Sequence, residues 1–98
     1  MAVDLRQYAK RSEVRLTTTG RSSGKPRTVR IWFVVEDANT FYVQHAEGPT
    51  SQWFKNLQAN SSISADFGDG ALAGEGVILT EEADIRQVMK RFRKKYLR

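Results

Sequence analysis

Hydrophobic and polar residues alternate along much of the chain, and this pattern predicts five or six β-strands. Residues 27–37 give the strongest signal, because apolar side chains fall on both faces of that stretch. Weaker alternation occurs on either side of it. The predicted strands cover residues 13–19, 27–37, 40–46, 61–67 and 73–79, and the first three of them should form a meander.

The period changes to that of a helix in three places. A short amphipathic helix is expected in 3–12, and another of two to three turns follows Thr50 or Ser51, either of which can cap it. In the last segment, apolar residues recur at helical spacing and Thr80 is the expected N-cap. That apolar stripe consists of Ile85, Val88, Met89 and Phe92.

Several strands interrupted by one short helix favour a small antiparallel barrel over a sandwich, because closure removes exposed sheet edges. The predicted class is therefore α+β, a barrel of five or six strands with a short middle helix and terminal helices. A chain of 98 residues leaves room for one domain, so residues 1–98 are expected to form a single unit.

Composition excludes several kinds of chemistry. The chain has no cysteine and one histidine, which rules out disulfides, thiolate metal sites and zinc sites with two or three imidazoles. No metal is expected. The N-terminus lacks the apolar core of a signal peptide, and no apolar run approaches the roughly 20 residues that span a bilayer. We therefore expect a cytoplasmic protein without a membrane span.

Positive charge is concentrated in two segments of a chain whose net charge is +5. The turn "GRSSGKPR", residues 20–27, holds three cations in a setting where backbone amides are free, which makes it a candidate phosphate site. The segment "KRFRKKYLR", residues 90–98, holds six more. We interpret this second run as the solvated end of a helix, with a membrane surface or a polyanion as the alternative. Nucleic acid is an unlikely partner.

Residues 16–60, from "LTTTGRSSGKPR" through "IWFVV" to "WFKNLQAN", resemble the deazaflavin-dependent nitroreductase and quinone reductase family. These proteins have the split β-barrel fold of the pyridoxamine 5'-phosphate oxidase-like flavoproteins. The resemblance implies a homodimer that holds coenzyme F420, or FMN in some relatives, in a groove near the subunit interface. It also implies a split-barrel flavin- or deazaflavin-binding domain.

The resemblance further implies which residues contact the cofactor. Arg21 and Arg27 would bind the phosphate side, and Trp32 would line the groove beside the ring. Two positions depart from the family: Ser22 stands where a lysine is common, and Ala46 where another cation is usual. The full set of expected cofactor-binding residues is Arg21, Ser22, Lys25, Arg27, Trp32, His45, Ala46, Gln52 and Trp53. No residue is assigned a catalytic role.

Two classes of function remain open from the sequence. One is an oxidoreductase that transfers a hydride from reduced F420, or from reduced FMN, to a quinone, a nitro compound or a similar small-molecule acceptor. Such an enzyme needs no ionisable nucleophile, because the cofactor carries the chemistry. The other is a non-catalytic binding module for a flavin or another anionic ligand, or a basic nucleic-acid-binding domain.

Overall fold

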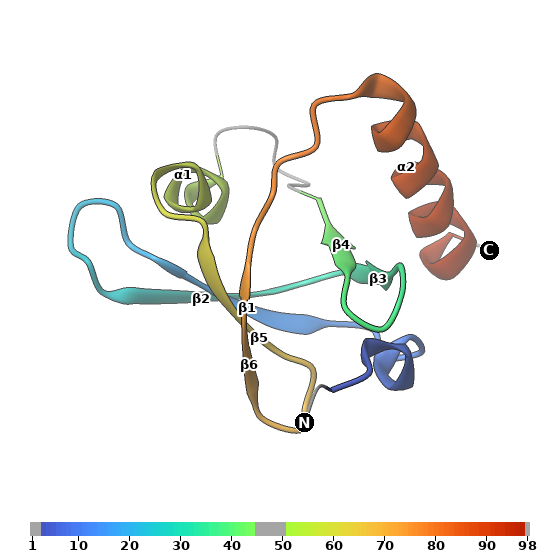
Figure 1. Cartoon of the computed structure of the whole chain (residues 1–98), viewed down its shortest axis with the longest axis horizontal. Coiled ribbons are helices and arrows are strands. Elements are labelled where there is room, and N and C mark those ends of the chain that lie inside the picture. The colour runs from blue at the N-terminus through green and yellow to red at the C-terminus, as the bar shows by residue number, and fades with distance from the viewer. Residues whose placement is uncertain (1–2, 45–50, 98) are drawn as a thin grey trace.

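The structure, a computed structural model, describes residues 3–44 and 51–97. Helix and strand elements follow one another with short connections (Figure 1). In chain order they are the 3-10 helix η1 (Leu5–Tyr8), β1 (Val14–Thr19), β2 (Pro26–Ile31), β3 (Phe33–Val35), β4 (Phe41–Val43), α1 (Gln52–Ala59), β5 (Ser62–Asp66), β6 (Ala71–Glu75) and α2 (Glu82–Tyr96). The N-terminal amphipathic helix that the sequence predicted is thus a single 3-10 turn.

The described strands pair in two antiparallel sheets. The larger sheet has the order β2-β1-β5-β6, and β3 pairs with β4 in a second sheet. Helix α1 lies against β1 and β2, while α2 lies against β3 at the other side of the molecule (Figure 1). The α+β class, the antiparallel strands and the short middle helix are all confirmed.

Residues from both sheets meet in one hydrophobic core. Val14 and Phe33 are fully buried there, and Tyr8 from η1 stacks on Phe67 with ring centroids 4.9 Å apart. A second, smaller cluster joins Val34 to Val88 and Phe92 of α2. Both faces of β3 are therefore buried. Phe33 and Val35 pack in the first cluster, and Val34 packs in the second.

Three predicted boundaries were wrong. The strand expected over 27–37 is broken at Trp32, so the meander is divided between the two sheets. The strand expected over 73–79 ends at Glu75, because Glu75 pairs with Ser62, the first residue of its partner strand β5. Helix α2 takes Glu81 rather than Thr80 as its N-cap.

The break at Trp32 is stabilised by the last turn of α2. The backbone N–H of Phe33 donates to the Tyr96 hydroxyl over 2.9 Å, and the Phe33 carbonyl accepts from Lys95 Nζ over 2.8 Å. The Tyr96 ring stacks on Trp32 with a centroid distance of 4.2 Å. Phe33 lies opposite Val43 of β4, and its backbone N–H and carbonyl are bonded to side chains of α2. Lys95 and Tyr96 therefore do not belong to a merely solvated helix end.

Lys95 makes the stability of the fold depend on pH. Burial lowers the pKa of Lys95 from 10.5 to about 8. The unfolded chain therefore binds more protons than the folded one between these values, and the free energy of unfolding should rise as the pH increases from 8 to 9.5. Urea unfolding across this range tests the slope, and Lys95→Met should abolish it. An unchanged slope in that variant would contradict the assignment.

Candidate functional site

The turn between β1 and β2 is held in a defined shape by its own hydrogen bonds. Gly20 N–H donates to the Lys25 carbonyl over 2.8 Å, and Gly24 N–H donates to the Gly20 carbonyl over 2.8 Å. Gly24 has a φ of 70°, a left-handed conformation that favours glycine. The turn is therefore a structured platform for the exposed side chains of Arg21, Lys25 and Arg27.

Arg21 fastens this turn to helix α1. Its Nη1 donates to Asn56 Oδ1 over 2.8 Å and its Nη2 donates to Gln52 Oε1 over 2.8 Å, while its backbone N–H reaches the same Asn56 oxygen over 3.2 Å. The two amides lie four residues apart and so share one face of the helix. Asn56 is 4% exposed and also donates to Thr18 Oγ1 of β1 over 3.5 Å.

The partners of Arg21 determine how much charge the turn presents. Amide oxygens are neutral, so they fix the guanidinium without cancelling its positive charge. No ion pair within residues 3–44 and 51–97 joins Lys25 or Arg27 to an acid, and residues 20–27 contain no acidic residue. Three cations in eight residues thus keep their charge, as an anion-binding turn requires.

Strand register places Arg27 on the same side of the sheet as Arg21. Arg27 lies opposite Thr18 in the β1–β2 pair, and opposed residues of an antiparallel pair project to the same face. Thr18 faces α1 through its contact with Asn56. Arg27 and the Arg21–α1 contact therefore belong to one region, at the hairpin end of the molecule.

The remaining predicted residues are distributed more widely. Trp32 follows the far end of β2, is 47% exposed and stacks on Tyr96. Trp53 is on α1 beside Gln52 but is only 8% exposed. Ser22 is exposed in the turn. His45 and Ala46 lie outside the described residues.

Sequence reasoning missed Asn56 and Thr18, both of which are buried. The available signal was the spacing of Gln52 and Asn56, two amides at i and i+4 on a helix that follows a cation-rich turn. Asn56 replaces none of the predicted residues. It explains how one of them, Arg21, is held.

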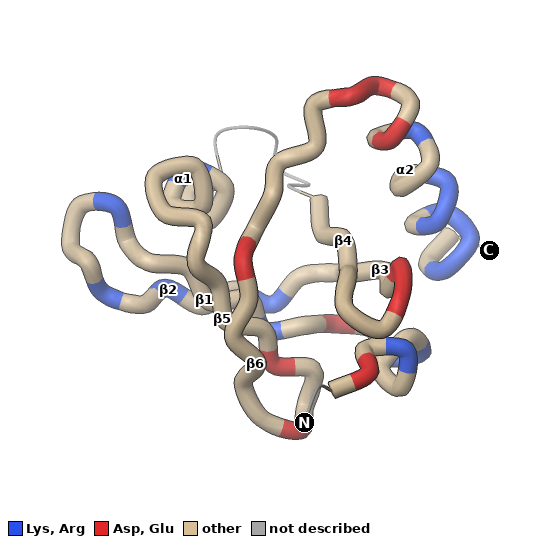
Figure 2. The backbone as a smooth tube through the Cα atoms, viewed as in Figure 1, with Lys and Arg blue, Asp and Glu red and all other residues tan. Residues whose placement is uncertain are grey.

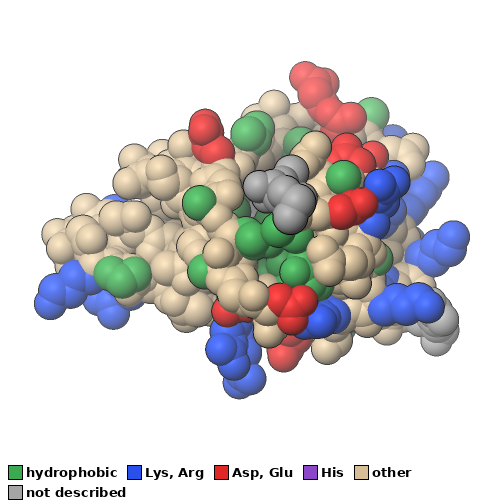
Figure 3. All heavy atoms as spheres, turned by 60° about the horizontal axis from the view of Figure 1, so that its bottom comes forward, with side chains coloured by type: hydrophobic (Ala, Val, Ile, Leu, Met, Phe, Trp, Pro, Cys, Tyr) green, Lys and Arg blue, Asp and Glu red, His purple; other side chains and the backbone are tan. Residues whose placement is uncertain are grey.

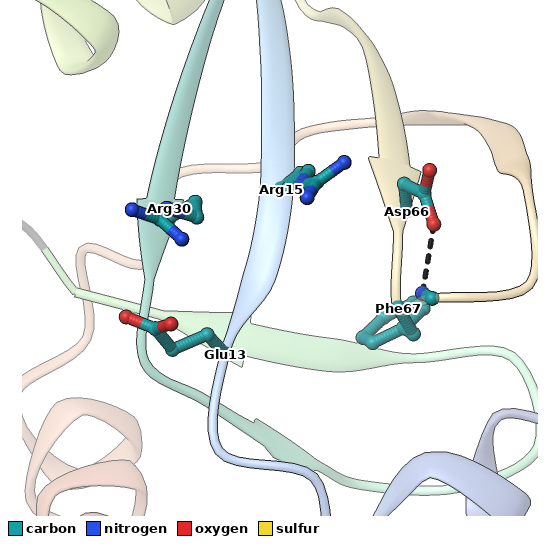
Figure 4. Close-up of a pocket in the computed structure, with 6 residues that line it drawn as sticks. Glu13, Arg15, Arg30, Asp66 and Phe67 are labelled. Atoms are coloured by element: carbon teal, nitrogen blue, oxygen red, sulfur yellow. Dashed lines mark hydrogen bonds between the residues drawn. The ribbon is translucent and has the colours of Figure 1, made fainter.

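The opposite face of the large sheet has two shallow depressions. One, of about 290 Å³, is lined by Glu13, Arg15, Arg30 and Asp66, with Arg15 directly opposite Arg30 (Figure 4). The other, of about 240 Å³, is lined mainly by threonine and serine residues. Because two acids accompany the two arginines, the first depression is electrically mixed and is a weaker anion site than the turn.

Over residues 3–44 and 51–97, no group of three or more His, Cys, Asp or Glu residues is placed to hold a metal ion. The candidate site is a cation-rich turn fixed to a short helix. These features define a small antiparallel α+β domain with a structured, positively charged turn between β1 and β2.

The family model described as F420H(2)-dependent quinone reductase matches residues 4–97. Because this match spans nearly the whole chain, the chain belongs to that family, as the sequence resemblance indicated. A search of curated proteins found no match.

Solved structures agree with the family assignment. One, described as an F420-H2 dependent reductase (FDR-A), has 28% sequence identity and a TM-score of 0.70, over 89% of this chain and 78% of that one. Another, described as a domain-swapped dimer, has 27% identity and a TM-score of 0.70, over 90% of this chain and 67% of that one. A third, at 17% identity with a TM-score of 0.64, supports the fold alone.

Proposed function

We propose that this chain binds coenzyme F420 and transfers a hydride from its reduced form to a small electron-poor acceptor. A quinone is the first candidate and a nitro compound the second. Support comes from the F420H(2)-dependent quinone reductase family, and from the structural similarity to a protein described as an F420-dependent reductase. FMN is the alternative cofactor, and a binding module without turnover is the alternative function.

The observation that carries this proposal is the uncompensated charge of the turn. Arg21 is held by the amide oxygens of Gln52 and Asn56, and Lys25 and Arg27 have no acidic partner among the described residues. A phosphate with an acidic tail, such as F420 carries, is a suitable ligand for three such cations. An uncharged ribityl chain would leave them without a ligand.

The chain's residues then take distinct roles. Arg21, Lys25 and Arg27 would bind the phosphate and tail, with Ser22 adding a hydroxyl beside them. Gln52 and Asn56 would act by holding Arg21 in position. Trp53, a buried residue of α1, would hold that helix against the rest of the domain. Trp32, braced by Tyr96, would offer a flat apolar surface to the ring, with His45 and Ala46 proposed for the same groove. When bound, the reduced deazaflavin supplies the hydride.

Turnover and binding are tested separately. Oxidation of reduced F420 by the purified protein, followed by the absorbance of F420 with and without a naphthoquinone, tests the reductase. Fluorescence titration with F420, and calorimetric titration with FMN and riboflavin, test the cofactor. Binding of F420 without acceptor-dependent oxidation would assign the chain to the binding module, and binding of FMN alone would replace the cofactor.

Arg27→Ala should weaken F420 binding roughly ten- to a hundredfold, because a charge-assisted contact contributes about 1.5 to 3 kcal/mol. Arg15→Ala provides the matched control, since Arg15 lies on the opposite face of the same sheet. Both side chains are exposed, so the fold should survive either change. Titration of both variants by fluorescence is the measurement, and an equal loss in both would contradict a local phosphate site.

The protein should form a homodimer with Trp32 and Arg30 near the interface. Trp32 is 47% exposed beside the edge strand β2, and an uncovered edge invites pairing with another chain. The structural relative described as a domain-swapped dimer supports this expectation. Light scattering at micromolar concentration measures the mass. A monomer would remove the basis for a cofactor groove shared by two subunits.

A further inference from the structure

The solvent-facing side of helix α2 carries cations and apolar residues in alternation. We call it the outward stripe and define it as Arg86, Met89, Lys90 and Arg93 of the helix together with its C-cap Leu97, all at helical spacing. Met89 is 44% exposed and Leu97 is 68% exposed, and the three cations are exposed as well. Large apolar side chains among unburied cations are typical of a surface that contacts something both negative and apolar.

Contacts on the other side of the helix fix the direction in which the outward stripe faces. Val88 and Phe92 pack against Val34, and Lys95 and Tyr96 are bonded to the backbone of Phe33. The helix therefore cannot turn about its axis to bury Met89 without breaking these contacts. The exposure of the stripe is a property of the packed fold.

Acidic and basic residues are separated along the helix. Its acids lie at the start, and from Arg86 onward every charged residue of α2 is a cation, as Figure 2 shows. Arg86 pairs with Glu82 over 2.6 Å, and Arg91 pairs with Glu36 over 3.0 Å. No ion pair within the described ranges joins Lys90 or Arg93 to an acid. Blue side chains also mark the α2 side of the surface in Figure 3.

We propose that the outward stripe docks the protein on an anionic lipid surface. Lys90 and Arg93 would lie over lipid phosphates, and Met89 and Leu97 would enter the headgroup region between them. The cations of the stripe and the anionic headgroups have opposite charges. Each cation near an anionic bilayer raises the partition coefficient of the protein by a factor of about five. The contact is peripheral: no helix among the described residues is long and apolar enough to cross a membrane.

A lipid surface fits the outward stripe better than a nucleic acid does. Phosphates of a duplex are contacted by cations and by polar hydrogen-bond donors, and exposed Met89 and Leu97 would have no function in such a contact. An interfacial helix uses both kinds of residue, with cations at the headgroups and apolar side chains at the acyl boundary. The apolar members of the stripe therefore decide between the two partners.

Vesicle flotation with the full chain tests the proposal. The protein should float with vesicles of phosphatidylcholine containing phosphatidylglycerol, and should not float with pure phosphatidylcholine. Lys90→Gln combined with Arg93→Gln should lower the partition coefficient about 25-fold, because two cations are removed. Met89→Gln combined with Leu97→Gln should lower it several-fold without any change of net charge.

The matched control is Arg15→Gln combined with Lys55→Gln, which removes the same charge from β1 and α1. This control should keep its binding to within about twofold, because charges beyond a Debye length of about 10 Å are screened. Equal loss in the two charge variants, or no flotation of the native chain, would overturn the proposal. So would stronger salt-sensitive binding to duplex DNA, or a change of oligomeric state in the Lys90 and Arg93 variant.

Discussion

Replacing Asn56 with aspartate should lower the affinity for F420 by about ten- to a hundredfold while leaving the protein folded. The aspartate keeps an oxygen acceptor where Asn56 Oδ1 lies 2.8 Å from Arg21 Nη1. It also adds a negative charge in direct contact with the guanidinium, so Arg21 stays in place but its positive charge is offset by the carboxylate. A lost charge-assisted contact to phosphate is worth about 1.5 to 3 kcal/mol, and fluorescence titration with F420 measures it.

Two comparisons separate charge from position in this experiment. A deazaflavin without the phosphate and acidic tail should bind the native chain and Asn56→Asp with similar, weak affinity. Asn56→Ala should instead release the turn and also lower the free energy of unfolding by about 1 to 3 kcal/mol, because buried groups lose their partner. If Asn56→Asp weakened both deazaflavins to the same extent, Arg21 would not be a phosphate contact.

Removing the hydroxyl of Tyr96 should lower the free energy of unfolding by about 1 to 3 kcal/mol, the cost of a buried polar group left without a partner. Tyr96→Phe deletes the acceptor of Phe33 N–H at 2.9 Å. It also deletes the hydroxyl proton of Tyr96. That one proton can be donated either to the Ser12 carbonyl at 2.9 Å or to the Phe33 carbonyl at 2.8 Å. Ring stacking on Trp32 should persist, so the loss reports the hydroxyl alone. Urea unfolding is the measurement.

Tyr42→Phe is the matched control for this change. Tyr42 also borders the smaller core cluster, and burial together with the nearby carboxylate of Glu36 raises the pKa of its hydroxyl. The side chain of Glu36 is 34% exposed. A carboxylate near the surface regains water when a partner is lost, so the expected cost is below about 1 kcal/mol. Equal losses in the two variants would show that the backbone of Phe33 does not depend on Tyr96.

Period-two and helical patterns predicted the α+β class and most of the elements, because alternate residues of β1 such as Val14 and Leu16 are in fact buried on one face of the strand. They failed at Trp32. Continuous apolar residues mark a stretch buried on both faces, but they cannot indicate that the two halves pair with different sheets. The break between the two halves is stabilised by contacts from Lys95 and Tyr96. Contacts between residues so far apart in the chain leave no pattern in the sequence around Trp32.

The candidate site shows the same division between local and distant information. Glycines and cations within eight residues were enough to predict an anion-binding turn, since both turn geometry and charge are local properties. The contact between Arg21 and Asn56 joins residues 35 positions apart, so the sequence alone did not reveal it. Resemblance to the family supplied the cofactor, which neither pattern nor charge could name.

Hydrogen exchange at the backbone amide of Phe33 should report when helix α2 separates from the rest of the domain. The Phe33 amide hydrogen is bonded to a tyrosine 63 residues further along the chain instead of to a neighbouring strand. Exchange of that hydrogen with solvent deuterium should therefore follow the undocking of α2, whereas amides within β1 should follow opening of the large sheet. Closing so long a loop is entropically costly, so the docking of α2 is expected to be a late step in folding and an early step in unfolding.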